Sequence, residues 1–154
     1  MKIAIVIWGV QNSGKSSTFK GIVHNYSEKQ ITQMRRGWQR LFLNSKFKCL
    51  KLDSYFFPAS PTESETNLEN YFKSPNFMPQ VLFLAEQING KNASNTKAFL
   101  HTNGYSVFDY FLSNTNGRDI WDRFDNLTEQ MKLKARADEI IMDIRDFIKK
   151  NQII

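Results

Sequence analysis

The stretch Ile3–Ile22, "IAIVIWGVQNSGKSSTFKGI", decides the fold. Its first six residues are all apolar and mostly β-branched, which is typical of a parallel strand buried on both faces. After Ser16, apolar side chains at positions 19, 22, 23 and 26 are spaced to form one face of a helix. We therefore expect a buried strand, a short loop that contains glycine, and an amphipathic helix in direct succession.

Residues 9–16, "GVQNSGKS", fit the pattern G-x-x-x-x-G-K-[ST] of a phosphate-binding loop. Glycine lets the backbone N–H groups approach a phosphate closely, and the positive end of the following helix faces the same anion. In this motif the lysine contacts the β- and γ-phosphates and the serine hydroxyl binds Mg²⁺. The expected nucleotide-binding residues are Gly9, Asn12, Ser13, Gly14, Lys15, Ser16 and Ser17.

Residues 1–27 resemble the opening strand, loop and helix of the P-loop NTPase superfamily, and the chain as a whole is more loosely similar to small nucleotide and nucleoside kinases. This resemblance implies an α/β fold with three layers, α/β/α, around a small and mostly parallel sheet of four to five strands. It also implies that the protein binds ATP with Mg²⁺ in a single domain over residues 1–154.

Further elements are expected along the rest of the chain. Val81–Ala85, "VLFLA", is a second wholly apolar strand and is expected beside the first at the centre of the sheet. The other expected strands are 47–53, an edge strand because of its lysines, and 105–112. The expected helices are 29–44 (whole or broken at Gly37), 92–100, and 118 to nearly the end, where Ala137, Ile140, Ile141, Ile144 and Ile148 share one face.

All four prolines lie between Tyr55 and Pro79, in an irregular insertion at about 54–79. A short helix is possible near 65–72. An excursion of this length is either a substrate loop or lid, or a variable surface insertion.

Composition limits the environment and the partners. The formal charge of +6 suits an anionic partner, such as a nucleotide, a nucleic acid or a phosphorylated metabolite. Cys49 is the only cysteine, so no internal disulfide forms and a reducing compartment is expected. The sequence shows no signal segment and no apolar run long enough to span a membrane, so we expect a cytoplasmic protein without a membrane partner.

Two carboxylates are candidate partners of the phosphate-binding loop, because each is expected at the carboxyl end of a strand. Glu86 closes "VLFLAE" and resembles the acid of a Walker B strand, so it could hold Mg²⁺ or polarise the attacking group. Asp53 closes "KCLKLD" and could serve as the base for an acceptor hydroxyl. The alternative for both is a solvated strand end.

Arginines could stabilise charge on a transferring phosphoryl group. Arg118 and Arg123 lie where a kinase lid is expected, although i, i+4 ion pairs with Asp122 and Asp119 would explain them without catalysis. A second cluster, Arg35, Arg36 and Arg40, follows the first helix. The proposed catalytic set is Lys15, Glu86, Asp53, Arg118 and Arg123, and the proposed Mg²⁺ ligands are Ser16 and Glu86.

The sequence favours a kinase-like phosphotransferase that passes the γ-phosphate of ATP to a small acceptor. A partner-dependent ATPase without a small-molecule acceptor is the alternative. A nucleic-acid-binding protein that uses the basic segment 29–51 ranks last, because it leaves the phosphate-binding loop unexplained. Guanine is disfavoured, since "NGKN" at 89–92 and "NTKA" at 95–98 both lack the aspartate of Asn-Lys-x-Asp.

Overall fold

The computed structural model of the protein describes residues 1–43, 50–62, 67–72 and 78–151. Strands and helices alternate along the chain apart from one pair of consecutive strands, which fits the predicted α/β class. The elements are β1 (Ile3–Gly9), α1 (Lys15–Tyr26), β2 (Gly37–Phe42), β3 (Lys51–Phe57), α2 (Leu68–Tyr71), β4 (Val81–Gln87), α3 (Ala93–Thr102), β5 (Ser106–Phe111) and α4 (Glu129–Lys150).

The five strands form one sheet in the order β2-β3-β4-β1-β5. Strands β3, β4, β1 and β5 are parallel, and β2 is antiparallel to β3. β1 and β4, which contain the two predicted apolar runs, are neighbours inside the sheet and are in register from Ile3 opposite Val81 to Gly9 opposite Gln87. The expectation of a small, mostly parallel sheet with these two strands side by side is confirmed.

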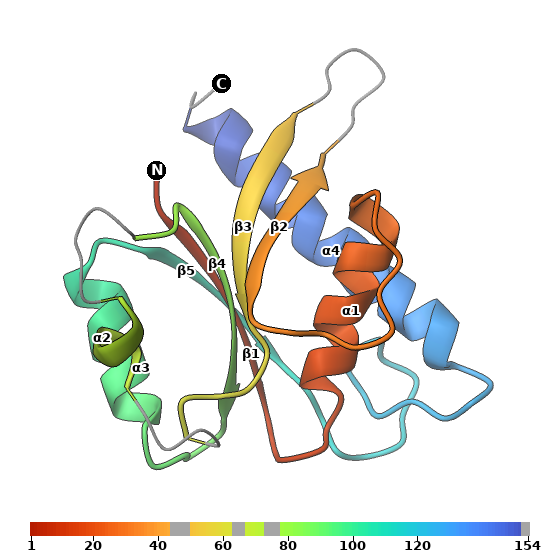
Figure 1. Ribbon diagram of the computed structural model, residues 1–154. Helices are drawn as coiled ribbons and strands as arrows, with labels where there is room; N and C mark the ends of the chain where they lie inside the picture. The colour runs from red at the N-terminus through yellow and green to blue at the C-terminus, as the bar shows by residue number, and fades with distance from the viewer. Residues whose placement is uncertain (44–49, 63–66, 73–77, 152–154) are drawn as a thin grey trace.

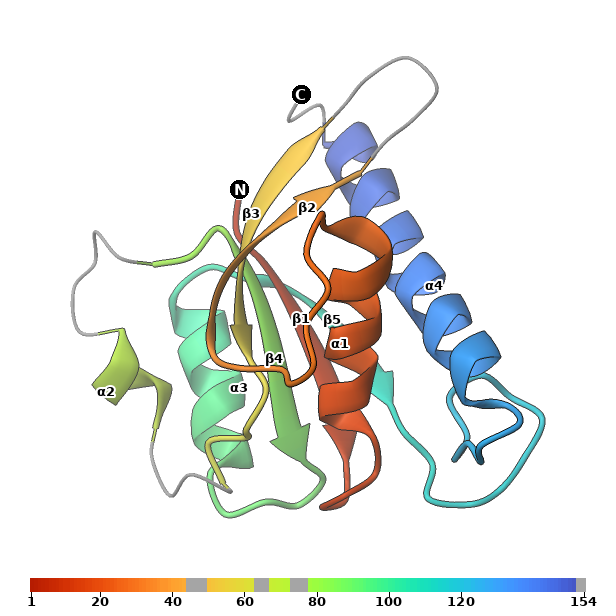
Figure 2. The same cartoon turned by 45° about the vertical axis from the view of Figure 1, so that its right-hand side comes forward.

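Helices cover both faces of the sheet, with α1 and α4 on one side and α2 and α3 on the other (Figure 1). Alternate residues of β1 point into two separate apolar cores. Ile3, Ile5 and Ile7 pack with α1 and α4, whereas Ala4, Val6 and Trp8 pack with the residues around α2 and α3. The turned view in Figure 2 shows α4 running alongside α1.

Helix α4 is shorter than predicted, but its apolar face is confirmed. It begins at Glu129, not near Arg118, and Ala137, Ile140, Ile141, Ile144 and Ile148 are all buried against the α1 side of the sheet. In the described part of the chain, none of the helices combines the length and the apolar character that crossing a membrane would need.

The region after α1 differs most from the sequence prediction. The predicted helix over 29–44 is wrong, because Gly37–Phe42 forms β2 and pairs with β3. The predicted strand 47–53 is shifted to Lys51–Phe57 and lies inside the sheet, since β2 covers its edge; its residues 47–49 lie outside the described residues. The predicted short helix 65–72 appears as Leu68–Tyr71, and positions 65 and 66 likewise fall outside the described range.

Candidate functional site

The loop of residues 9–16 (the 9–16 loop) lies at the carboxyl end of β1 and leads directly into α1, at the lower end of the sheet in Figure 1. Two of its residues adopt positive φ angles, Asn12 at 61° and Gly14 at 99°. A Cβ atom at position 9 would lie 2.3 Å from the Ser13 hydroxyl oxygen, so a side chain there would force Ser13 to move. The sequence pattern is therefore matched by the backbone that it requires.

Lys15 and Ser13 are folded into this loop. The Lys15 ammonium donates hydrogen bonds to the carbonyls of Gly9 at 3.2 Å and Val10 at 2.8 Å, and the side chain is buried although it begins a helix at the surface. Ser13 is also buried, and within the described residues its hydroxyl oxygen has no hydrogen-bond partner. Buried polar groups normally have partners, so this unpaired hydroxyl is an exception among the described residues.

A cavity of about 500 Å³ (the loop pocket) opens in front of the 9–16 loop. Among the described residues, its lining comes from 11–17, Pro58, Arg123 and Phe124, and it includes no carboxylate. No side chain caps the first turn of α1, whose N–H groups and positive dipole end lie at this pocket. The Ser16 hydroxyl is 3.4 Å from the Pro58 carbonyl oxygen. Because the described lining has no carboxylate and the positive end of α1 faces it, the pocket favours an anion.

Arg123 and Phe124 come from the segment 113–125 (the 113–125 loop), which follows β5 and lies beside the 9–16 loop at the lower end of Figure 1. The predicted helix over this segment is wrong. Its aspartates accept hydrogen bonds from nearby backbone N–H groups instead: Asp119 from Trp121, Asp122 from Asp119, and Asp125 from Leu127 and Thr128. These local turns replace the i, i+4 ion pairs considered for Arg118 and Arg123.

Two buried cations on α4 hold the 113–125 loop in place. Lys132 donates to the carbonyls of Gly117 at 2.8 Å and Arg123 at 2.9 Å. Arg136, one helical turn later, donates to the carbonyls of Ile120 and Asp122. Both side chains are almost fully buried, so α4 fixes the backbone on either side of Arg123.

Arg136 also connects α4 to the 9–16 loop. Its Nη1 donates to the Thr18 hydroxyl at 3.2 Å, and that hydroxyl donates to the Gly14 carbonyl at 2.9 Å. Its guanidinium group lies between the rings of Trp121 and Phe124, at 5.6 and 5.3 Å from their centroids. Within the described part of the chain it has no ion-pair partner, and burial lowers its pKa to about 10. It thus remains charged at neutral pH and adds positive potential behind the loop pocket.

Glu86 lies away from the loop pocket. It is opposite Trp8 in the sheet, on the face covered by α3, and is fully buried. One carboxylate oxygen accepts from the Thr96 hydroxyl of α3 at 2.8 Å and the other from the Gln87 N–H at 2.9 Å. Glu86 is not among the described lining residues of the loop pocket, and both of its carboxylate oxygens accept hydrogen bonds, so the structure does not bring it to Ser16 as the predicted Mg²⁺ ligand and catalytic group.

Asp53 and Arg118 are not brought to the pocket either. Asp53 does not close its strand, because β3 continues to Phe57; it is exposed and paired with Arg40 of β2 at 2.8 Å. Asp53 therefore lacks the position at the end of a strand from which its role as base for an acceptor hydroxyl was predicted. Arg118 is exposed and does not line the loop pocket, whereas Arg123 does. Of the five predicted catalytic residues, the structure brings Lys15 and Arg123 together.

Sequence reasoning missed Lys132, Arg136, Phe124 and Pro58. A signal for the first two was present: they stand at i and i+4 on α4 and Arg136 adjoins Ala137, where the buried apolar face begins. Comparison of the chain with protein family models, curated proteins and solved structures found no match.

Proposed function

We propose that this protein is a P-loop nucleotide-binding domain that binds ATP at the 9–16 loop and transfers its γ-phosphate to a small acceptor. The observation that carries the proposal is the 9–16 loop itself: a G-x-x-x-x-G-K-S sequence between a buried parallel strand and a helix, with left-handed backbone at Asn12 and Gly14 and a pocket without carboxylates in front of it.

Three groups at this pocket have a role in that reaction. The backbone N–H groups at the start of α1 bind phosphate oxygens, and the Lys15 ammonium moves from two loop carbonyls onto the phosphates. Arg123 contributes a guanidinium group that balances the negative charge developing on the transferred phosphoryl group.

The donor set agrees with Mg²⁺ at one position. The Ser16 hydroxyl faces the pocket next to the Pro58 carbonyl, and both are oxygen ligands of the kind that Mg²⁺ accepts alongside water and phosphate. Bound there, the ion would neutralise phosphate charge and orient the γ-phosphate.

Calorimetric titration with Mg·ATP and, in parallel, Mg·GTP tests the proposal. Replacing Lys15 by alanine removes a charge-assisted contact and should weaken ATP binding about 10- to 100-fold. Lys149→Ala is the matched control, because it removes one positive charge from the exposed last turn of α4 and should leave the affinity unchanged. Circular dichroism checks that both variants fold.

Equal ATP affinity in the wild type and Lys15→Ala would refute the role of the 9–16 loop. Mass spectrometry of reactions with added nucleosides, monophosphates and small metabolites then separates transfer from hydrolysis. ATP turnover without any phosphorylated product would contradict the acceptor and leave the partner-dependent ATPase.

A further inference from the structure

A second, smaller cavity adjoins the loop pocket. It has a volume of about 250 Å³ and is lined by Met34, Arg35, Arg36, Phe57, Pro58 and Ala59 (the arginine pocket). Pro58 lines both cavities, and its carbonyl oxygen is the atom that contacts the Ser16 hydroxyl. The arginine pocket is therefore reached from the loop pocket across a single residue at the carboxyl end of β3.

The two arginines of this cavity are held differently. Arg36 stacks over Phe57 and Tyr71, with its guanidinium carbon 5.0 and 4.4 Å from the ring centroids. These cation–π contacts orient its plane while its N–H groups stay at the exposed surface. Arg35 is exposed, and in the described chain its guanidinium group makes no ion pair. Arg40, the third arginine of the cluster, is already neutralised by Asp53.

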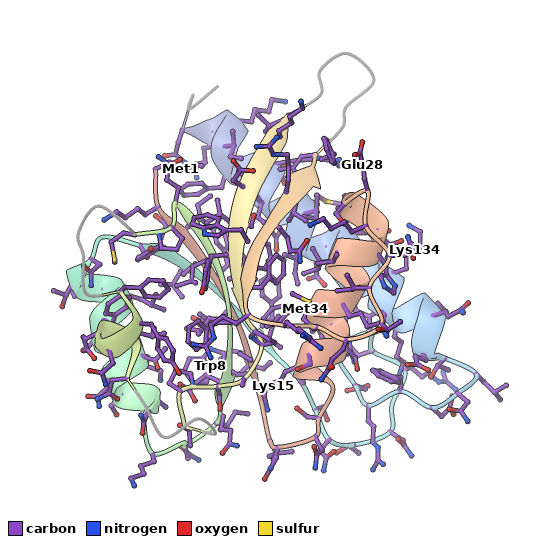
Figure 3. All side chains as sticks on the ribbon, in the orientation of Figure 1. Met1, Trp8, Lys15, Glu28, Met34 and Lys134 are labelled. Carbon is purple, nitrogen blue, oxygen red and sulfur yellow. The ribbon has the colours of Figure 1, made fainter. Side chains whose placement is uncertain are left out.

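The remaining wall of the cavity is apolar. Met34 packs in the core between the sheet and α1, as Figure 3 shows, and Phe57 packs in the core on the opposite face. Both side chains are almost fully buried, so this wall is part of the fixed framework. A cavity with two guanidinium groups on one side and carbon on the other suits a small organic molecule that carries a phosphate or similar anion.

From this arrangement we propose that the arginine pocket binds the phosphoryl acceptor, and that the acceptor is a small phosphomonoester with a free hydroxyl group. Arg35 and Arg36 bind its existing phosphate, and its hydroxyl oxygen points across Pro58 toward the γ-phosphate. That oxygen forms the new bond to the γ-phosphorus, the bond from the γ-phosphorus to the bridging oxygen breaks, and ADP leaves with the electron pair. The hydroxyl proton goes to solvent. The inference rests on the proposed function.

The test uses three phosphomonoester or phosphate probes (AMP, ribose 5-phosphate and inorganic phosphate) and two neutral partners, adenosine and ribose. Binding of each to the protein without ATP is measured by calorimetry for the wild type, Lys15→Ala, Arg35→Gln, Arg36→Met and Lys149→Gln. Arg36→Met keeps apolar packing on Phe57 and Tyr71 while it removes the charge. Lys15→Ala weakens phosphate binding at the 9–16 loop, so a preference for phosphomonoesters that it leaves unchanged belongs elsewhere.

At least one phosphomonoester should bind about tenfold more tightly than its neutral partner, also in Lys15→Ala. Arg35→Gln and Arg36→Met should each abolish this preference, and Lys149→Gln should keep it. The proposal is overturned if no phosphomonoester outcompetes its neutral partner, if the arginine variants keep the preference, or if Lys149→Gln loses it equally.

Failure of the two proposals is distinguishable. A protein that binds phosphomonoesters through Arg35 but does not bind Mg·ATP contradicts the proposed function and the acceptor role, and keeps the arginine pocket as a phosphomonoester site. A protein that binds Mg·ATP through Lys15 but shows no arginine-dependent preference contradicts the acceptor alone. Mass-spectrometric detection of doubly phosphorylated product, lost in Arg35→Gln at unchanged ATP affinity, supports both.

Discussion

Gly14 combines two constraints, one in its own backbone and one in its neighbourhood. Its φ of 99° is a conformation that costs other residues about 1–2 kcal/mol. A Cβ atom there would also lie 3.2 Å from the ring of Phe124, which lines the loop pocket. The residue therefore allows the 9–16 loop and the 113–125 loop to approach each other.

We expect Gly14→Ala to lower both stability and nucleotide affinity. Gly104→Ala is the matched control, because Gly104 has a φ of 76° but nothing within 4 Å of its Cβ position. Both substitutions carry the backbone cost, and only the first displaces Phe124. Thermal unfolding and ATP titration of the pair measure the difference; equal ATP affinity in the two variants would contradict a shared pocket.

Arg136 is a buried cation that binds two segments at once: α1 through Thr18, and the 113–125 loop through the carbonyls of Ile120 and Asp122. Arg136→Met keeps much of the volume but leaves these acceptors buried and unpaired. We expect it to lower the free energy of unfolding by about 3 kcal/mol, because bonds to a charged donor are each worth about 1.5–3 kcal/mol.

Lys134→Met is the control for Arg136→Met. It removes a cation from the same helix, but Lys134 makes only an exposed i, i+4 pair with Asp138, so its loss should cost at most about 0.5 kcal/mol. Urea unfolding of both variants measures the contrast. Similar losses of unfolding free energy in the two variants would show that the buried hydrogen bonds of Arg136 stabilise the protein no more than an exposed ion pair does.

At the scale of the element, the sequence predicts best where burial is complete. β1 is apolar throughout, β4 is apolar over Val81–Ala85, and both stretches are enclosed on both faces, so pattern and structure agree. The sequence predicts a helix at β2 because what makes this segment a strand is its pairing with β3, a tertiary contact. Along β2 only Leu41 is fully buried, so the alternation that marks a strand is faint.

The 113–125 loop was mistaken for a helix for a different reason. Opposite charges at 118/122 and 119/123 have the spacing of helical ion pairs, but aspartate also accepts hydrogen bonds from its own backbone neighbours. Glu86 shows the same limit at the site: an acid after an apolar run predicts a strand end, but not which face of the sheet the acid occupies. The 9–16 loop was predictable because its chemistry is local.

Helix α4 is held against α1 and the sheet mainly by the apolar face that the sequence predicts. Ile144 is fully buried in the core between α4, α1 and the sheet, whereas Met142, two residues earlier, is largely exposed. We expect Ile144→Ala to lower the free energy of unfolding by about 2–5 kcal/mol, since it opens a cavity in a packed core. Met142→Ala should change it by less than about 0.5 kcal/mol. Chemical denaturation of both variants measures the difference, and comparable losses of unfolding free energy would refute the assignment of the buried face.

At the scale of the molecule, strand order brings the parts of the site together. The chain leaves β1 toward α1 on one face and leaves β4 toward α3 on the other, although β1 and β4 are neighbours. Ligands of α/β proteins bind at such reversals, beyond the carboxyl ends of the strands. The 9–16 loop after β1, Pro58 after β3 and Arg123 after β5 all lie at this edge, from three distant parts of the sequence.

Two buried tyrosines make the stability of the protein sensitive to alkaline pH. The Tyr110 hydroxyl of β5 donates a hydrogen bond to Asp143 of α4. The pKa of Tyr110 is raised mainly by its burial and, to a smaller extent, by this hydrogen bond. Burial raises the pKa of Tyr105, whose hydroxyl donates to the Pro79 carbonyl, to about 12. The unfolded chain releases these protons near pH 10, so between about pH 10 and 12 the native state binds more protons and stability falls as pH rises.

Each such tyrosine should steepen this fall by at most about 1.4 kcal/mol per pH unit. Urea unfolding of the wild type, Tyr110→Phe and Tyr105→Phe between pH 9 and about pH 11.5 measures the slopes. Removing a hydroxyl lowers stability at neutral pH, because its hydrogen bond is lost, but it should also flatten the alkaline slope. The slope is the informative quantity, since lysine deprotonation is common to all three proteins. An unchanged slope in both variants would mean that these hydroxyls ionise as freely in the folded protein as in the unfolded chain, and that Tyr110 does not tie β5 to α4.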